Sequence, residues 1–151
     1  MTPTMDMNQA DRKLRIGVLG CGPIAQIAHF DACSKARNCE LYAICDLADD
    51  LRNRMQAMWE PPAAYGSYAQ MLEDPLVDAI IVGVADQFHV PLAMQAIRAG
   101  KHVFVEKPMG VSIEECQQLQ EQLRQTSLVL QVGNNRRFDP GVVFAKSFID
   151  Q

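Results

Sequence analysis

The chain has 151 residues and a mass of 16.8 kDa, the size of one ordinary domain. Hydrophobic residues make up 48% and charged residues 21%, which excludes a disordered or fibrous chain. A net charge of -4 argues against a general binder of nucleic acid or of membrane surfaces, since both need a basic patch. No apolar run has the roughly 20 residues of a membrane-spanning helix, and the N-terminus lacks the order of a secretion signal. The five cysteines show no CxxC spacing, so we expect reduced thiols, no metal site and a cytoplasmic location.

Short apolar runs alternate with longer amphipathic stretches after a polar start. Residues 1–13 show no period, and we predict a flexible tail there. In chain order the predicted elements are strand 14–19, helix 23–36, strand 41–45, helix 47–59, a short helix ending at 74, strand 78–84, helix 88–99, strand 102–105, helix 112–125 and strand 128–132. Capping boxes of Ser67 with Gln70 and of Ser112 with Glu115 begin two of these helices.

Strands separated by helices of ten or more residues are typical of βαβ units and of a parallel sheet. Right-handed crossovers between such strands give a doubly wound, Rossmann-like α/β domain. We therefore predict one dinucleotide-binding domain over residues 14–138, with residues 139–151 beginning a further helix.

The strongest local motif is a GxGxxA run directly after the first strand, made of Gly20, Cys21, Gly22, Pro23, Ile24 and Ala25. Its glycines allow a tight turn and a close approach of the backbone to a pyrophosphate, and a small residue such as Ala25 lets helix and strand pack closely. Asp46 ends the second strand, where a carboxylate can bind the ribose 2′-hydroxyl and repel a 2′-phosphate. The pattern favours NAD over NADP, although Arg52 and Arg54 soften the preference. The alternative is a structural turn followed by a helix-capping aspartate.

Ligands of open parallel sheets bind at the carboxyl ends of the strands. The runs that leave those ends are Ala85-Asp86-Gln87, Glu106-Lys107-Pro108 and residues 133–137. Lys107 has an extended backbone before proline, so its ammonium either points into the crevice or pairs with Glu106. His89 begins a helix at a strand end and is a candidate for binding, whereas His29 and His102 are more simply structural.

Four blocks resemble the glucose–fructose oxidoreductase, inositol dehydrogenase and MocA family. They are IGVLGCGPIA with His29 downstream, AICD ending at Asp46, AGKHVFVEKPM around Lys107, and VGNNRRFDP at residues 132–140. The resemblance implies hydride transfer between a nicotinamide cofactor and a sugar, cyclitol or similar polyol. It assigns substrate binding and catalysis to Lys107 before an often cis proline, and it places Arg137 near the active site.

The resemblance also implies cofactor contacts by residues of several loops. It assigns the pyrophosphate to Gly20, Gly22, Pro23 and Ile24, the adenosine ribose to Asp46, and the nicotinamide side to the loop from Ala85 to His89, with Glu106 beside Lys107. The family's usual Thr-Pro-Asn-like run before the histidine is replaced here by Ala85-Asp86-Gln87. Contacts made by those side chains are therefore not carried over.

Family members are usually more than twice as long and carry a second α/β domain that supplies most of the substrate pocket. We expect this chain to be either the nucleotide-binding half of a longer enzyme or a single-domain relative. In either case we expect NAD binding with little turnover, and self-association through apolar surface near the last helix. The other readings are a non-catalytic dinucleotide-binding module and a scaffold protein.

Overall fold

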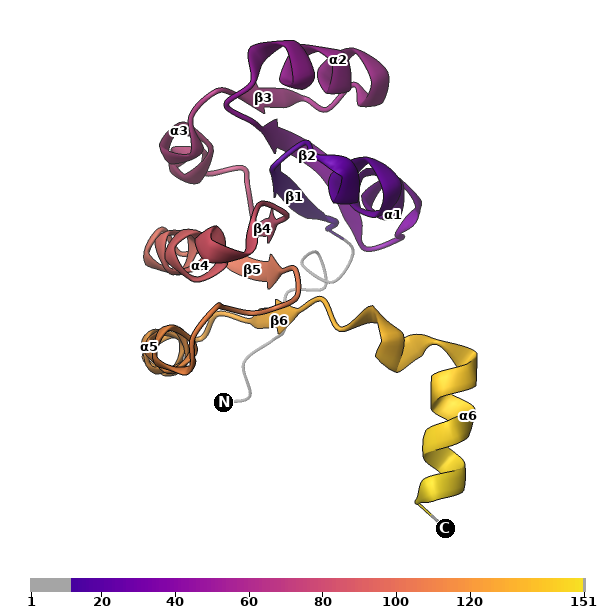
Figure 1. Cartoon of the computed structure of the whole chain (residues 1–151). Helices are drawn as coiled ribbons and strands as arrows, with labels where there is room; N and C mark the ends of the chain where they lie inside the picture. Colours follow the sequence, from indigo (N-terminus) through magenta and orange to yellow (C-terminus); the bar gives the residue numbers. More distant parts are fainter. Residues whose placement is uncertain (1–11, 151) are drawn as a thin grey trace, which may run out of the picture.

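The computed structural model describes residues 12–150. Its strands form one parallel sheet in the order β3-β2-β1-β4-β5-β6 (Figure 1). The strands are β1 (Leu14–Leu19), β2 (Cys39–Cys45), β3 (Ala63–Tyr65), β4 (Ala79–Val82), β5 (His102–Val105) and β6 (Leu130–Val132). The order reverses between β1 and β4, which is the point where ligands of doubly wound sheets bind. The predicted Rossmann-like fold is confirmed.

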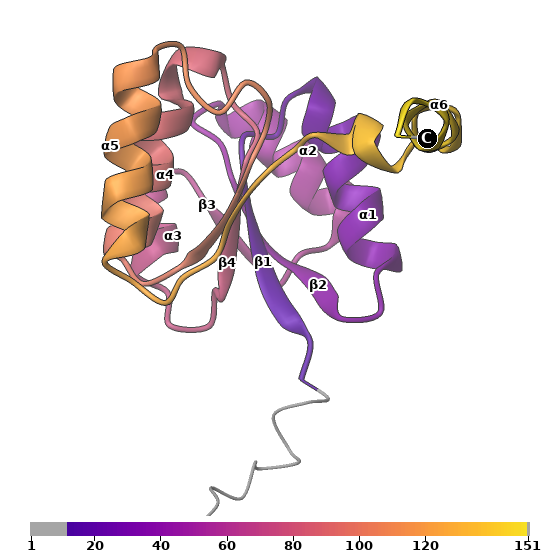
Figure 2. The same cartoon turned by 90° about the horizontal axis from the view of Figure 1, so that it is seen from below.

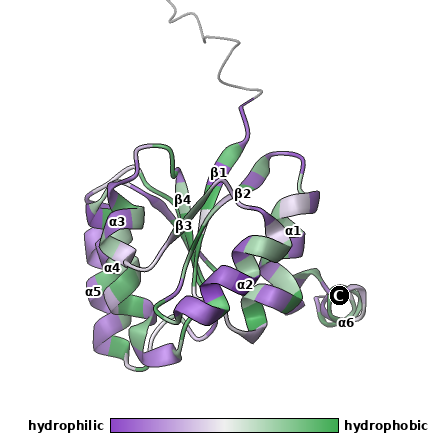
Figure 3. Ribbon diagram, turned by 90° about the horizontal axis from the view of Figure 1, so that it is seen from above, coloured by the Kyte–Doolittle hydropathy of each residue, from purple (hydrophilic) through white to green (hydrophobic). Residues whose placement is uncertain are grey.

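Helices cover both faces of the sheet. They are α1 (Phe30–Lys35), α2 (Asp49–Trp59), α3 (Tyr68–Glu73), α4 (His89–Arg98), α5 (Ile113–Arg124) and α6 (Pro140–Ile149). Figure 2 shows α3, α4 and α5 on one face and α1 and α2 on the other, with α6 outside both layers. Hydrophobic residues run along the strands between the two layers in Figure 3. The sheet thus separates two apolar clusters, one centred on Ile80, Val105 and Leu119 and the other on Val18, Phe30 and Ile44.

Most predicted elements lie where the sequence placed them, and the differences have local causes. The short strand β3 was missed because its three residues, Ala63–Tyr65, follow two prolines and show no alternation. The helix predicted over 23–36 contains a π-helical turn at Ala25–His29 before α1. Ser112 caps α5 by accepting the Glu115 N–H at 3.2 Å, as predicted, whereas the Ser67 side chain makes no cap hydrogen bond to α3.

The two ends of the domain differ from the expectation in one respect. The predicted tail over 1–13 lies mostly outside the described residues, but Arg12 within it donates to Asp78 at 2.8 Å and is therefore anchored. At the other end α6 points away from the sheet (Figure 1) and exposes Phe144 and Phe148. Self-association through this apolar surface stays a prediction. Within residues 12–150 no helix has the length and apolarity needed to cross a bilayer.

Candidate functional site

The glycine turn joins β1 to the following helix at the switch point. Gly20 has φ +92°, and a Cβ there would lie 2.7 Å from the Gly83 carbonyl oxygen, so only glycine fits. A Cβ at Gly22 would meet nothing within 4 Å, so the backbone at this position faces open space. Ala25 is fully buried, as close packing of the helix against β1 requires. The turn therefore has the open backbone that an incoming pyrophosphate needs.

Cys21 contributes its backbone and not its thiol. Its side chain is fully buried. Burial first, and then the Asp46 carboxylate, raise the pKa of the Cys21 thiol to about 12, so the sulfur stays protonated. Its N–H donates to Asp46 Oδ2 at 2.8 Å.

Asp46 ties the glycine turn to the end of β2. While Oδ2 accepts the Cys21 N–H, Oδ1 accepts the Ala48 N–H at 2.9 Å. The carboxylate also lines the cavity beside the turn. Each carboxylate oxygen has two acceptor sites, so bracing the loop leaves capacity for a further donor. Asp46 does not cap α2, whose N-cap is Ala48 without a side-chain hydrogen bond, but its bracing of the loop and the predicted ribose contact are compatible in one side chain.

Arg52 is held by the same loop, which the sequence did not reveal. Its guanidinium donates to the Asp46 carbonyl oxygen at 2.8 Å and pairs with Asp49 at 2.7 Å. The side chain is only 16% exposed, and it lies against Gly66. Arg52 therefore has its donors directed at its own loop, whereas the sequence offered it as a partner for a 2′-phosphate.

A cavity of about 390 Å³ opens beside Asp46 between the ends of β1, β2 and β4. Its lining is almost wholly apolar and comprises Leu19, Gly20, Cys45, Asp46, Leu47, Tyr68, Val84, Ala85, Phe88 and Leu92. Tyr68 is oriented by donating its hydroxyl to the Leu92 carbonyl at 3.0 Å. An apolar slot with one carboxylate at its edge suits a flat heterocycle attached to a ribose.

His89 begins α4 after the end of β4, as the sequence suggested, but its side chain is enclosed by the protein. It is only 1% exposed, and its ring nitrogens lie 2.6 Å from the Pro108 carbonyl oxygen and 3.0 Å from the Val84 carbonyl oxygen. Both nitrogens therefore face the protein, and the ring braces the loop after β4 against the loop after β5. A direct contact of this side chain with a ligand is inconsistent with that geometry. Burial, which a sequence pattern at the start of a helix does not report, is the reason.

In the loop after β5, Lys107 forms no ion pair with any residue between 12 and 150. Glu106 instead lies 3.1 Å from His29 Nε2, and its other oxygen accepts the Lys107 backbone N–H at 3.2 Å. The alternative in which Lys107 pairs with Glu106 is therefore wrong. The Lys107–Pro108 bond is cis, as the resemblance implied.

Lys107 lines a second cavity of about 430 Å³. The other residues that line it are Gly133, Asn134, Asn135, Arg136, Arg137 and Val142. Arg136 is paired with Asp139 at 3.2 Å, whereas Arg137 has no ion pair within the described residues. The cavity therefore brings together the two loops that the sequence singled out, with amines and amides facing it.

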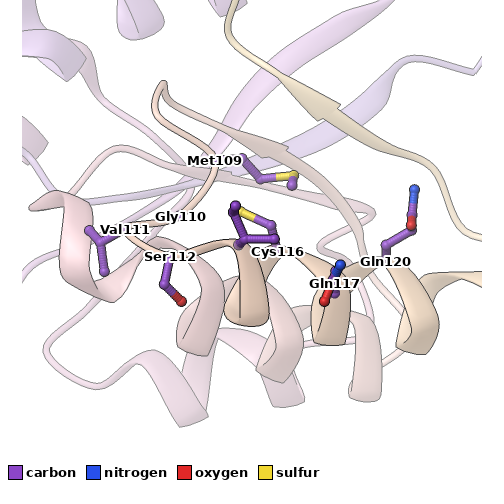
Figure 4. Close-up of a pocket in the computed structure, with 8 residues that line it drawn as sticks. Met109, Gly110, Val111, Ser112, Cys116, Gln117 and Gln120 are labelled. Atoms are coloured by element: carbon purple, nitrogen blue, oxygen red, sulfur yellow. The ribbon is translucent and has the colours of Figure 1, made fainter.

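A third cavity, of about 490 Å³, lies against the first turns of α5 (Figure 4). Its lining residues are Met109, Gly110, Val111, Ser112, Ile113, Cys116, Gln117 and Gln120. None of the predicted site residues is among them. Within residues 12–150 no three His, Cys, Asp or Glu side chains are grouped as metal ligands would be.

The sequence predicted the loops of the site but not the apolar side chains that line the cavity beside Asp46. Leu47, Tyr68, Phe88 and Leu92 come from three segments that meet only in the fold, namely the loop after β2, the start of α3 and the start of α4. The one sequence signal available was the apolar character of Leu47 and Phe88 in the segments that follow β2 and β4, where polar residues are usual.

A family model described as an oxidoreductase family with an NAD-binding Rossmann fold matches residues 14–134. Myo-inositol 2-dehydrogenase from Thermotoga maritima is 34% identical over 126 residues, which cover 83% of this chain and 37% of that protein. Inositol 2-dehydrogenase from Salmonella typhimurium is 30% identical over 142 residues, covering 91% of this chain and 41% of that protein.

Solved structures show the same fold with either cofactor. Scyllo-inositol dehydrogenase from Lactobacillus casei, with bound NAD(H) and scyllo-inositol, is 28% identical with a TM-score of 0.86, covering 93% of this chain and 42% of that one. A 3-ketoreductase from Actinomadura kijaniata, in complex with TDP-benzene and NADP, is 27% identical with a TM-score of 0.86, covering 92% and 44%. The chain spans about two fifths of the length of the relatives it matches.

Proposed function

The chain belongs to the glucose–fructose oxidoreductase, inositol dehydrogenase and MocA family of oxidoreductases, and from that premise we propose that it binds NAD for hydride transfer with a polyol. The observation that carries the proposal is the open backbone at Gly22 beside an apolar cavity edged by Asp46. The pyrophosphate would lie against the Gly22 backbone, the ribose against Asp46 and the adenine in the apolar cavity.

The preference for NAD over NADP rests on charge at the end of β2. A 2′-phosphate would bring negative charge to the Asp46 carboxylate, which is already held in place by two backbone donors. Arg52, the nearest candidate for neutralising it, is paired with Asp49 and bonded to the Asp46 carbonyl. These contacts direct the Arg52 guanidinium at its own loop and already neutralise part of its charge. Because the Actinomadura kijaniata ketoreductase contains NADP, the affinities of this chain for NAD and for NADP have to be measured side by side.

The residues of this chain would hold and activate the reactants as follows. The turn at Gly20 and Gly22 would bind the pyrophosphate and Asp46 the adenosine ribose. When bound, the nicotinamide supplies an acceptor for hydride at its C4 atom. Lys107 would accept the hydroxyl proton as the carbinol carbon loses hydride, and the alcohol would become a ketone. Arg137 would orient the substrate in the cavity that it shares with Lys107.

Polyols are the substrate class that the relatives suggest, since one matched structure contains scyllo-inositol. These 151 residues correspond to about two fifths of such enzymes, and in this chain the cavity at Lys107 is lined by the segments after β5 and β6 and by Val142 of α6. Substrate positioning is worth about 7–11 kcal/mol of a reaction barrier. We therefore expect cofactor binding with little turnover from this chain alone.

Calorimetric titration of the purified chain with NAD, with NADP as the paired control, tests the cofactor assignment. We expect NAD to bind and NADP to bind at least about tenfold more weakly, because one uncompensated charge contact is worth about 1.4 kcal/mol or more. Binding of neither dinucleotide would refute the proposal, and equal binding would refute the role given to Arg52. Robust NADH formation from scyllo-inositol by the pure chain would refute the expected lack of turnover.

A further inference from the structure

His29 lies at the centre of the switch point, although the proposed function gives it no task. It ends the π-helical turn that follows the glycine turn, and it is 7% exposed. Its ring packs edge-on against Phe104 of β5, with centroids 5.6 Å apart, and it lies beside Gly83 at the end of β4. Turns of this kind inside helices are frequent at functional sites, because they redirect one side chain without ending the helix.

The carboxylate of Glu106 joins this histidine to the lysine loop. Oε1 lies 3.1 Å from His29 Nε2, and Oε2 accepts the Lys107 N–H at 3.2 Å. The Glu106 side chain is only 17% exposed. Gly133 lies so close to it that a Cβ on this glycine would be 3.1 Å from Oε2. One carboxylate thus contacts both the helix that begins at the glycine turn and the first residue of the Lys107 loop.

The contact between His29 and Glu106 buries polar groups, and the free-energy cost of that burial is higher than structural support alone would require. Burial lowers the pKa of His29, and the neighbouring Glu106 carboxylate opposes that shift only in part. Nε2 is buried, and within the described residues no acceptor meets it with hydrogen-bond alignment. An apolar pair of similar size would fill this space at lower cost. Polar groups kept at such a cost point to a task at the site.

We propose that His29 is a positioning residue for Lys107. Through the polar contact of Nε2 with Oε1 of Glu106 at 3.1 Å, a contact without hydrogen-bond alignment, the imidazole keeps Oε2 under the Lys107 N–H and so sets the direction in which the lysine side chain leaves β5. The inference rests on the proposed function, in which Lys107 handles the substrate proton. His29 and Glu106 thereby connect the helix after the glycine turn with the loop that carries Lys107.

The test measures Lys107 directly and uses the whole chain without cofactor. Deuterium exchange of the Lys107 amide, followed by NMR, reports its bond to Glu106. Acetylation of the Lys107 amine, measured by mass spectrometry relative to Lys146, reports the side chain. In His29→Leu we expect the amide to exchange about tenfold faster, as loss of one hydrogen bond to a charged acceptor implies, and the acetylation ratio to change.

Two variants separate positioning from general support of the fold. His29→Gln retains an amide donor near the position of Nε2, and we expect it to restore both Lys107 readouts to within about twofold of the wild type. His102→Leu is the matched control, because His102 begins β5 at the end of that strand opposite Glu106 and Lys107, and it accepts the Val129 N–H at 3.0 Å. It is expected to leave Lys107 unchanged.

Unchanged Lys107 rates in a folded His29→Leu protein, or a His29→Gln protein that behaves like His29→Leu, would overturn the inference. If His29→Leu does not fold, His29→Asn replaces it, since the shorter amide does not reach Glu106 and the same rise in exchange is expected. No NAD is present in these measurements, so their failure is distinct from a failure of NAD binding, which the calorimetric titration reports.

Discussion

Replacing Gly22 by alanine separates the ligand role of the glycine turn from its folding role. A Cβ at Gly22 meets no atom within 4 Å, and its φ does not lie in the left-handed region. At Gly20, two residues earlier, φ is +92° and a Cβ would lie 2.7 Å from the Gly83 carbonyl oxygen. The same substitution at the two positions is therefore expected to have opposite consequences.

The size of each effect follows from these contacts. Gly22→Ala leaves the fold intact and raises the free energy of unfolding by up to about 1 kcal/mol, because alanine restricts the unfolded chain. Its methyl group stands where the pyrophosphate must approach the backbone. Losing one charge-assisted hydrogen bond costs about 1.5–3 kcal/mol, so NAD affinity should fall about 10- to 100-fold. Gly20→Ala combines a left-handed backbone with an overlap on Gly83, which together cost about 2–5 kcal/mol and lower the melting temperature by about 10 °C.

Calorimetric titration with NAD and thermal unfolding followed by circular dichroism are the two assays, each applied to both variants and the wild type. The expected pattern is weak binding at normal stability for Gly22→Ala and low stability for Gly20→Ala. Normal NAD affinity in Gly22→Ala would refute the placement of the pyrophosphate at this turn. A normal melting temperature in Gly20→Ala would refute the steric argument.

Three further predictions concern the rest of the domain. Lys101 is 8% exposed and donates to two backbone carbonyls at 2.7 and 2.8 Å. Lys101→Met should therefore lower the free energy of unfolding, measured with urea, by about 2–4 kcal/mol. A change below about 0.5 kcal/mol would contradict the role of these two hydrogen bonds. Arg52→Ala should weaken NAD binding in calorimetry by about tenfold without any gain for NADP, since its guanidinium braces the Asp46 loop, and improved NADP binding would contradict this. Burial alone would raise the pKa of Asp78, but hydrogen bonds from Arg15 N–H and the Arg12 side chain lower it on balance. The stability that this carboxylate contributes is therefore present above about pH 4 and lost as pH falls further, and urea midpoints measured from pH 6 to 3 should fall less in Asp78→Asn than in the wild type.

The sequence by itself determined the order of elements and the fold class. Local patterns suffice for this, because an apolar strand, a GxGxxA turn and a helix are each encoded within about ten residues. It also located the loops at Asp46, Lys107 and Arg137, since parallel strands bring their carboxyl ends to one edge of the sheet. The short strand β3 escaped because three residues carry no period and its pairing with β2 is made only in the folded sheet.

Only the tertiary structure decided which side chains face a ligand and which face the protein. His89 and Arg52 both looked available along the chain, yet one is enclosed between two carbonyls and the other is bonded to its own loop. His29 looked structural, yet it meets Glu106, which is 77 positions away in the numbering and belongs to another strand end. Burial and long-range partners depend on how helices pack across the sheet, and no spacing within a single segment of sequence records that packing.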